Sequence, residues 1–145
     1  MHRDELLGAW LLESCISKSS SGTQVSPMGD APRGLLIYSE SGHMAAVLEK
    51  SGRPKFASDD LLRGTPDEVR QAFEGSTAYA GTFEFDEKTG TVTHHASVAT
   101  YPNWEETDQV RFAKLVGGKL ELTTPPIKAG GQTWVMSLQW RQAGA

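Results

Sequence analysis

Two tryptophans near the ends of the chain constrain its fold more than any other feature. Gly8-Ala9-Trp10 begins the first apolar strand-like segment, and Trp140-Arg141 ends the last one. This bracketing predicts an antiparallel sheet that closes on itself, with the Trp10 indole filling one end. We expect Arg141 to stack on that indole, an interaction that contributes about 0.5–2 kcal/mol. A closed barrel of about eight strands is just wide enough inside for side chains or one small ligand.

Apolar and polar side chains alternate between these ends with the period of half-buried strands. The predicted strands cover residues 8–17, 34–38, 43–48, 78–86, 90–100, 107–116, 119–124 and 131–141. Most connections are short and turn-like, as an up-and-down meander requires. Residues 18–33 form a longer segment rich in Ser, Gly and Pro. Long loops of this kind are usually functional, so we expect it to fold over the barrel mouth as a lid.

One short helix is predicted after Thr65. This threonine is a cap, Pro66 takes the first helical position and Glu68 completes a capping box. The apolar stripe of the helix consists of Val69, Ala72 and Phe73. A single helix among strands usually covers an open edge or one end of a barrel, and a moving lid is the alternative. The expected fold class is therefore all-β, with one short helix.

Composition limits the class of protein. A chain of 145 residues, 38% hydrophobic and 22% charged, predicts one globular domain over residues 1–145. A net charge of −4 without a basic cluster argues against nucleic-acid binding. The single cysteine, Cys15, excludes an internal disulfide and fits a reducing compartment. We see no apolar signal segment or membrane span, so we expect a cytoplasmic protein without membrane contact.

The adjacent histidines His94 and His95 have the most chemical promise. Neighbouring residues of a strand point to opposite faces, so at most one of them faces the barrel interior. Val92, Ala96 and Val98 share a face with His94, a pattern that buries His94 and exposes His95. A polar pocket would invert this arrangement, so both remain catalytic candidates beside a purely structural role. No His, Cys or Asp cluster has metal-ligand spacing, and we expect neither a metal nor a cofactor.

Arg111 is the third catalytic candidate. In its strand, Val110 and Phe112 share one face, while Gln109 and Arg111 share the other. The apolar pair predicts that Arg111 faces solvent. In the alternative, Arg111 faces inward, where a guanidinium holds a carboxylate or an enolate with two hydrogen bonds. With His95 also inside, the barrel would hold an acid/base group beside an anion-stabilising group.

Aromatic and apolar side chains supply the predicted pocket wall. Tyr79 and Phe83 share a strand face with Gly81, which leaves room for a flat ligand, although the rings would equally fill a core. Asn103 and Trp104 are predicted to gate the barrel entrance. Trp104 and Trp134 have a second interpretation, as anchors of a homodimer interface. The predicted ligand-binding residues are Tyr38, Met44, Tyr79, Phe83, His95, Asn103, Trp104, Arg111 and Trp134.

An ordered series of motifs resembles the bacterial and fungal lipocalin-like domain family over residues 6–141. The motifs are Gly8-Ala9-Trp10, Gly34-Leu35-Leu36-Ile37-Tyr38, Gly42-His43-Met44, Tyr79-Ala80-Gly81-Thr82-Phe83, Val92-Thr93-His94-His95, Pro102-Asn103-Trp104 and Gln109-Val110-Arg111. The resemblance implies a calycin-type, up-and-down antiparallel lipocalin-like β-barrel with a central cavity. It implies no single activity, although some members are accessory proteins of natural-product pathways. Ser97 departs from the family pattern, in which a glutamate often follows the histidine pair, and Ala9 replaces a more usual threonine.

Three functions are compatible with these observations. The favoured one is a binding module for a small, largely apolar molecule with one polar or carboxylate group. The alternative is an isomerase or cyclase-type enzyme for a small hydrophobic, natural-product-like substrate. In that enzyme His95 or His94 moves a proton and Arg111 stabilises negative charge, so its site requires His, Arg and Tyr to meet in the cavity. A haem barrel with a histidine axial ligand is the third and rests on one strand histidine alone.

Overall fold

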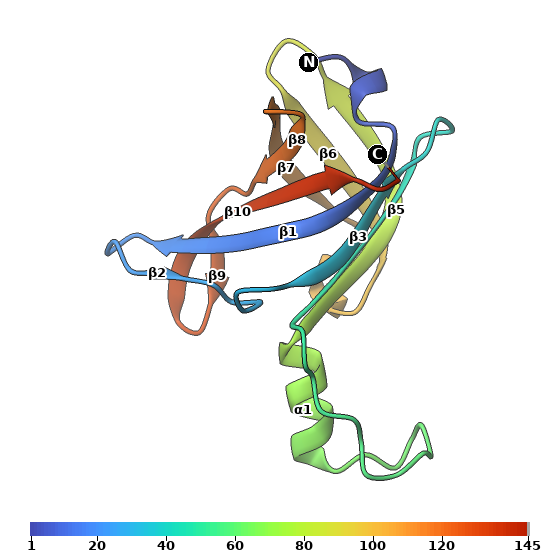
Figure 1. Cartoon of the computed structure of the whole chain (residues 1–145), viewed down its shortest axis with the longest axis vertical. Coiled ribbons are helices and arrows are strands. Elements are labelled where there is room, and N and C mark those ends of the chain that lie inside the picture. Colours follow the sequence, from blue (N-terminus) through green and yellow to red (C-terminus); the bar gives the residue numbers. More distant parts are fainter. Residues whose placement is uncertain (145) are drawn as a thin grey trace.

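The computed structural model describes residues 1–144 and forms a closed antiparallel barrel (Figure 1). In order around the ring, the strands are β1 (Gly8–Ser19), β3 (Arg33–Tyr38), β4 (His43–Glu49), β5 (Ser76–Asp86), β6 (Thr91–Ala99), β7 (Thr107–Val116), β8 (Lys119–Thr123) and β10 (Gln132–Gln142). β10 pairs with β1 and closes the ring. The structure confirms the predicted all-β, up-and-down barrel.

Two short strands extend one end of the barrel beyond the ring. β2 (Gln24–Val25) pairs with β1, and β9 (Ile127–Ala129) pairs with β10. β2 lies within the segment that we expected to be a loop without regular structure. The same segment brings Met28 to a buried position against the core, with 7% of its surface exposed. The segment therefore covers part of this end, and its motion as a lid stays a prediction.

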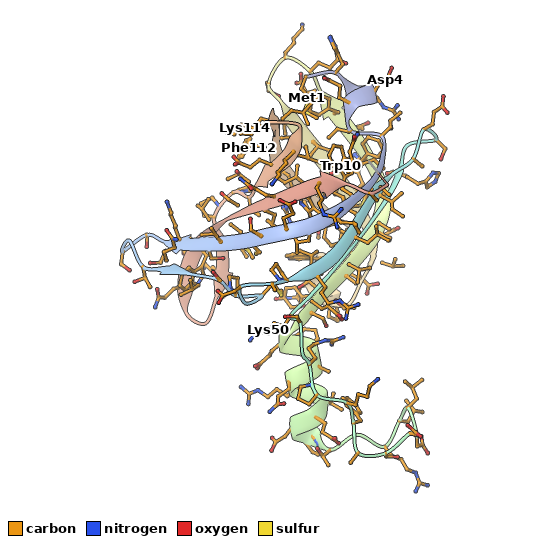
Figure 2. The ribbon with its side chains drawn as sticks, in the orientation of Figure 1. Met1, Asp4, Trp10, Lys50, Phe112 and Lys114 are labelled. Carbon is orange, nitrogen blue, oxygen red and sulfur yellow. The ribbon has the colours of Figure 1, made fainter. Side chains whose placement is uncertain are left out.

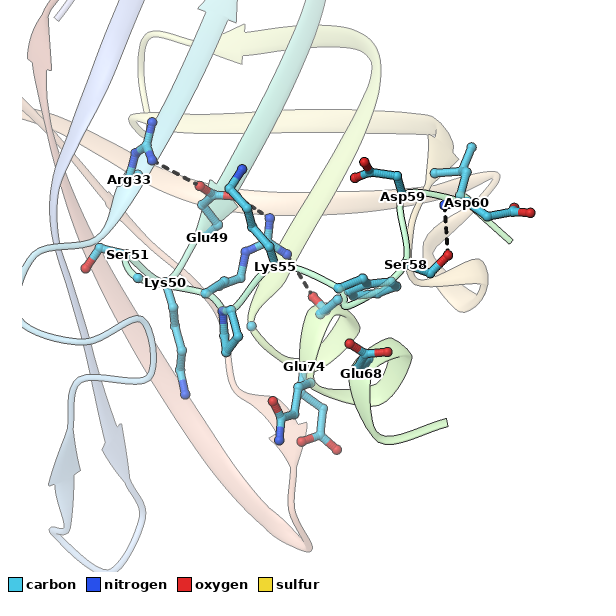
Figure 3. A pocket seen from close by; sticks show the side chains of 18 residues that line it. Arg33, Glu49, Lys50, Ser51, Lys55, Ser58, Asp59, Asp60, Glu68 and Glu74 are labelled. Atoms are coloured by element: carbon cyan, nitrogen blue, oxygen red, sulfur yellow. Dashed lines mark hydrogen bonds and ion pairs between the residues drawn. The ribbon is translucent and has the colours of Figure 1, made fainter. Parts of the chain in front are cut away.

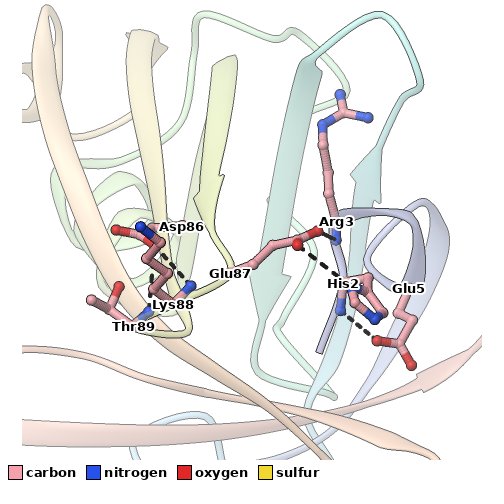
Figure 4. A network of polar contacts seen from close by, with 7 residues as sticks. All are labelled: His2, Arg3, Glu5, Asp86, Glu87, Lys88 and Thr89. Carbon is pink, nitrogen blue, oxygen red and sulfur yellow. Dashed lines mark hydrogen bonds and ion pairs between the residues drawn. The ribbon is translucent and has the colours of Figure 1, made fainter.

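The opposite end is closed by the N-terminal residues. After the 3₁₀ helix η1 (Arg3–Glu5), Leu6 is fully buried, and its carbonyl accepts a hydrogen bond from the Trp10 indole N–H at 2.8 Å. Figure 4 shows how Glu87, in the β5–β6 turn, holds the helix. The Glu87 carboxylate accepts a hydrogen bond from the Arg3 backbone N–H at 2.9 Å. Trp10 thus fills this end as the sequence predicted.

The predicted stacking of Arg141 on Trp10 is wrong. Arg141 lies on the outer surface, where its side chain is 53% exposed and its Nε is 3.8 Å from a Glu13 oxygen. It directly follows the inward-facing Trp140, and strand alternation sends it outward. Figure 2 shows Trp10 among the side chains inside the barrel.

Helix α1 (Pro66–Glu74) begins as predicted but lies elsewhere than expected. The Thr65 hydroxyl accepts a hydrogen bond from the Glu68 N–H at 3.2 Å, and the Glu68 carboxylate accepts one from the Thr65 N–H at 2.9 Å. The helix projects from the barrel, and none of its residues is buried (Figure 1). Residues 50–64 run along it, with the Ala57 N–H donating to Glu68. The helix therefore covers neither an edge nor an end of the barrel.

Candidate functional site

A cavity of about 200 Å³ lies inside the barrel. Its wall is mostly apolar and includes Met28, Leu36, Ala46, Trp104, Met136 and Trp140. The polar side chains of the wall are Thr77, Tyr79, His94, Arg111 and Thr124. Since an apolar cavity of about 150 Å³ holds benzene, this volume fits one ring with small substituents.

His94 lies between two tyrosines, one from β3 and one from β5. The Tyr38 hydroxyl oxygen is 2.6 Å from Nε2, and the Tyr79 hydroxyl oxygen is 2.7 Å from Nδ1. Burial lowers the pKa of His94 to about 3, and the nearby charge of Arg111 acts in the same direction. Burial also raises the pKa of both tyrosine hydroxyls, while Arg111 opposes the rise. All three groups are therefore neutral at pH 7.

Arg111 brings a positive charge into this wall. The residue is 6% exposed, its Nη1 donates a hydrogen bond to the Val110 carbonyl at 2.8 Å, and its guanidinium carbon is 5.9 Å from the Trp104 ring centroid. Within residues 1–144, no carboxylate forms an ion pair with Arg111. The cavity lining contains no acidic side chain either. A buried cation without a counter-ion costs several kcal/mol, unless a ligand compensates it.

The inward position of Arg111 contradicts the apolar pattern of its strand. Phe112 is 49% exposed, and Phe112 and Lys114 lie on the outer side of β7 (Figure 2). In the sheet register Arg111 pairs with Val92, which is fully buried. Because paired residues share a face, Arg111 points inward. One signal was missed: the charged residues Asp108 and Lys114 share the strand face of Phe112.

His95 does not face the cavity. Its Nδ1 is 2.6 Å from Asp108 Oδ1, and its Nε2 is 3.3 Å from Glu84 Oε2, on the outer surface. Hydrogen bonds to these carboxylates, that to Asp108 first, raise the pKa of His95. The interpretation that His95 and Arg111 face inward together is wrong, because strand alternation places His94 inside. The simpler pattern, which buried His94 and exposed His95, is confirmed.

The other predicted ligand-binding residues fall into three groups. Tyr79, Trp104 and Arg111 line the cavity. Tyr38, Met44 and Phe83 are buried in the core outside its lining. Asn103 and Trp134 also lie outside the lining.

The positions of Asn103 and Trp134 have local causes. Asn103 is exposed in the 3₁₀ turn η2 (Pro102–Trp104), which turns only Trp104 toward the cavity. The Trp134 indole N–H donates to the Ala129 carbonyl at 3.0 Å, where β10 pairs with β9. Neither residue contributes to the wall.

Most of the wall lies outside the predicted ligand-binding set, and three of its residues show why. Met28 comes from a segment without periodicity, so no signal identified it. Cys15 was considered only for its redox state; it lines the cavity, and burial raises the pKa of its thiol to about 11. Trp140 was recognised as the end of the last strand but was not included in the predicted set. In the described chain its indole N–H is buried without a hydrogen-bond partner.

A larger hollow of about 920 Å³ lies outside the barrel, between α1 and residues 50–64 (Figure 3). Charged side chains line much of it, and several already pair with one another. The Glu49 carboxylate is 2.5 Å from Arg53 and 3.8 Å from Arg33. Because these charges satisfy each other at an open surface, we place the candidate ligand site in the barrel cavity.

The cavity does not fit a haem group held by histidine. His94 lines it, but both ring nitrogens contact tyrosine hydroxyls and neither is free to bind iron. Among residues 1–144 we find no group of three or more His, Cys, Asp or Glu side chains suited to a metal ion. Over the same range, no helix is long and apolar enough to span a membrane.

Comparison with known proteins agrees with this architecture. A family model described as a lipocalin-like domain matches residues 7–143. One similar protein, from Aspergillus oryzae, is named 4'-hydroxy-3'-methoxypropiophenone carrier protein. It is 31% identical over 106 residues, which cover 68% of this chain and 96% of the relative.

Proposed function

The chain belongs to the lipocalin-like domain family, and we propose that its barrel binds one small, largely apolar molecule whose polar group meets Arg111 and Tyr79. The observation that carries this proposal is the apolar cavity of about 200 Å³, with a buried guanidinium in its wall that has no counter-ion among the described residues. The name of the Aspergillus relative describes a carrier of a single-ring aryl ketone. A ligand of that size fits this cavity.

Burial of the ligand supplies most of the expected affinity. Removing about 300 Å² of apolar surface from water contributes about 7 kcal/mol before the costs of association. The hydrogen bonds from Arg111 and Tyr79 then fix the orientation of the ligand and select molecules with an acceptor. The net affinity is smaller than this gross contribution, because the loss of translational and rotational freedom on association opposes it.

The chemistry of the wall supports binding over the isomerase or cyclase alternative. Tyr79, His94 and Arg111 do meet in the cavity, as that alternative requires. Abstraction of a proton also needs a base within hydrogen-bonding reach of the substrate. Both nitrogens of His94 contact tyrosines, the wall has no acidic side chain, and burial raises the pKa of the Cys15 thiol to about 11. The wall therefore offers no ready base.

A pair of neighbouring alanines in β4 provides the test. Ala46 lines the cavity, whereas Ala45 lies on the opposite face of the same strand. We expect Ala46→Leu, which adds three carbon atoms to the cavity, to weaken binding of 4'-hydroxy-3'-methoxypropiophenone by about tenfold or more. Ala45→Leu is the matched control and should leave the affinity unchanged. Calorimetry measures both, after circular dichroism has shown that each variant is folded.

Native mass spectrometry of the chain purified from its own host complements this test. A retained molecule of discrete mass supports the proposal and identifies the ligand class. If no molecule is retained and the probe does not bind, the proposal is wrong. The same spectra test the homodimer, which stays a prediction, as do the cytoplasmic location and the absence of nucleic-acid partners.

A further inference from the structure

The hydrogen bonds around His94 leave one proton without an acceptor. At pH 7 the two tyrosine hydroxyls and the neutral imidazole carry one proton each, because burial disfavours every charged form. Two contacts join them, from Tyr38 to Nε2 and from Tyr79 to Nδ1. Each contact uses one proton, so three protons serve two hydrogen bonds. The third proton belongs to Tyr38 or to Tyr79, depending on the tautomer of His94.

Burial decides between the two tautomers. Tyr38 is 1% exposed and lies outside the cavity lining, so a spare proton there would be a buried, unsatisfied donor. Tyr79 lines the cavity, where a ligand can accept its proton. The favoured network therefore runs in one direction: the Tyr38 hydroxyl donates to Nε2, and the Nδ1–H donates to the Tyr79 oxygen. The Tyr79 O–H is then free to donate into the cavity.

We propose that the cavity binds its ligand as an anion, with an ionised carboxylate, phenolate or enolate oxygen that accepts hydrogen bonds from Tyr79 and Arg111. This inference rests on the proposed function and names the chemical form of its ligand. It also assigns a role to His94, as a positioning residue that orients the Tyr79 hydroxyl toward the cavity.

The one charged group facing the site favours this form. The titratable groups of the wall come from β1 (Cys15), β5 (Tyr79), β6 (His94) and β7 (Arg111), with Tyr38 of β3 behind them. Of these groups Arg111 alone is charged at pH 7. A neutral acid would bring another proton to a place that already presents two donors, whereas its conjugate base accepts both. A positive charge within about 4–6 Å lowers the pKa of an acid by about 1–3 units, an effect that burial opposes.

Absorption spectroscopy tests the inference directly, because a phenolate absorbs at longer wavelength than its phenol. The probes are 4'-hydroxypropiophenone, which ionises, and its methyl ether 4'-methoxypropiophenone, which does not. We expect the bound phenol to ionise at a pH at least one unit below that of the free probe in the same buffer, a preference of about tenfold. The methyl ether should bind more weakly by at least that factor at a pH above the pKa of the free phenol.

Variants separate the two donors. Arg111→Met should abolish the spectral shift, and Arg111→Lys, which keeps the charge, should retain part of it. Tyr79→Phe should weaken binding of the phenolate by about tenfold and that of the methyl ether much less. The matched control is Tyr101→Phe, at a tyrosine that is 42% exposed and outside the wall.

The outcomes distinguish this inference from the proposed function. If the wild-type chain binds both probes equally and the phenol keeps its neutral spectrum, the inference is overturned and the proposed function stands. If neither probe binds, both are overturned. A long-wavelength spectrum that depends on Arg111 supports both.

Discussion

Acidification should destabilise this chain through His94. Burial lowers the pKa of His94 from 6.5 to about 3 in the folded state. Above pH 6.5 the imidazole is neutral in both states, and its full contribution to stability is present. As the pH falls below 6.5, the unfolded chain takes up a proton that the folded chain refuses. Stability is therefore lost until the pH approaches the folded-state pKa.

The size of this loss follows from the interval between the two pKa values. From 6.5 down to pH 5 the interval is 1.5 units, and each unit corresponds to about 1.36 kcal/mol. His94 alone should therefore remove about 2 kcal/mol of unfolding free energy between pH 7.5 and pH 5. His95 acts in the opposite sense, since its carboxylate neighbours raise its pKa. Its contribution is present below the unfolded pKa and is lost as the pH rises through the folded pKa.

Urea unfolding of three proteins at pH 7.5, 6 and 5 isolates the effect. The wild-type chain is compared with His94→Gln, which cannot titrate, and with His95→Gln, which removes the opposing group. The stability difference between wild type and His94→Gln should shrink by about 2 kcal/mol from pH 7.5 to pH 5. A difference that stays constant over this range would refute the argument. If His94→Gln does not fold, nitrogen NMR of the wild-type chain measures the pKa of the His94 imidazole instead. Protonation of His94 above pH 5 in the folded chain would also refute the argument.

Three further predictions concern single positions. Gly81→Ala should destabilise the chain by about 3 kcal/mol or more. The reason is that a Cβ at this position would lie 1.9 Å from the His95 carbonyl oxygen, at the β5–β6 bulge. An unchanged urea midpoint would contradict this prediction. Thr65→Ala should cost α1 about 1 kcal/mol. Because α1 projects from the barrel, hydrogen exchange should accelerate at 66–74 only, and equal acceleration in the barrel would show that α1 supports the core. The Cys15 thiol, whose pKa burial raises to about 11, should react with iodoacetamide at pH 8 only after unfolding, and rapid alkylation of the native chain would disprove its burial.

Local patterns determine much of this fold and could be interpreted without a structure. Strand alternation located all eight strands of the ring, and the capping box around Thr65 located the start of α1. The direction in which α1 leaves the barrel depends on contacts with residues 50–64, which have no period. The same limit applies to Met28, whose place in the cavity wall results from the path of a long connection.

The candidate site was less predictable, because its chemistry opposes the usual burial pattern. His94 was placed correctly, since its neighbours on the inner face are apolar. Arg111 was expected outside, because Phe112 was taken as the buried side chain of β7. A binding cavity reverses this preference: it keeps a charge inside at a cost in stability, and Phe112 remains half exposed. The pairing of β7 with β6 shows the exchange directly.

If Arg111 is retained for binding, its removal should make the empty chain more stable. Replacing a buried ion pair with apolar side chains of similar volume often stabilises a protein by about 1–4 kcal/mol, and a buried charge without a counter-ion has no Coulombic gain to offset its desolvation. We expect Arg111→Met to raise the unfolding free energy of the ligand-free chain within this range. A ligand at about a hundred times its Kd adds about 2.7 kcal/mol to the stability of the wild type, and the variant should lose most of this gain for an ionised ligand.

Urea titrations with and without 4'-hydroxypropiophenone measure both effects on the same samples. A variant that is more stable when empty and less responsive to the probe fits a charge held in the cavity for its ligand. An empty variant that is less stable than wild type would contradict this view. In that case the hydrogen bond to the Val110 carbonyl and the contact with Trp104 outweigh the cost of burying the charge, and Arg111 supports the fold itself.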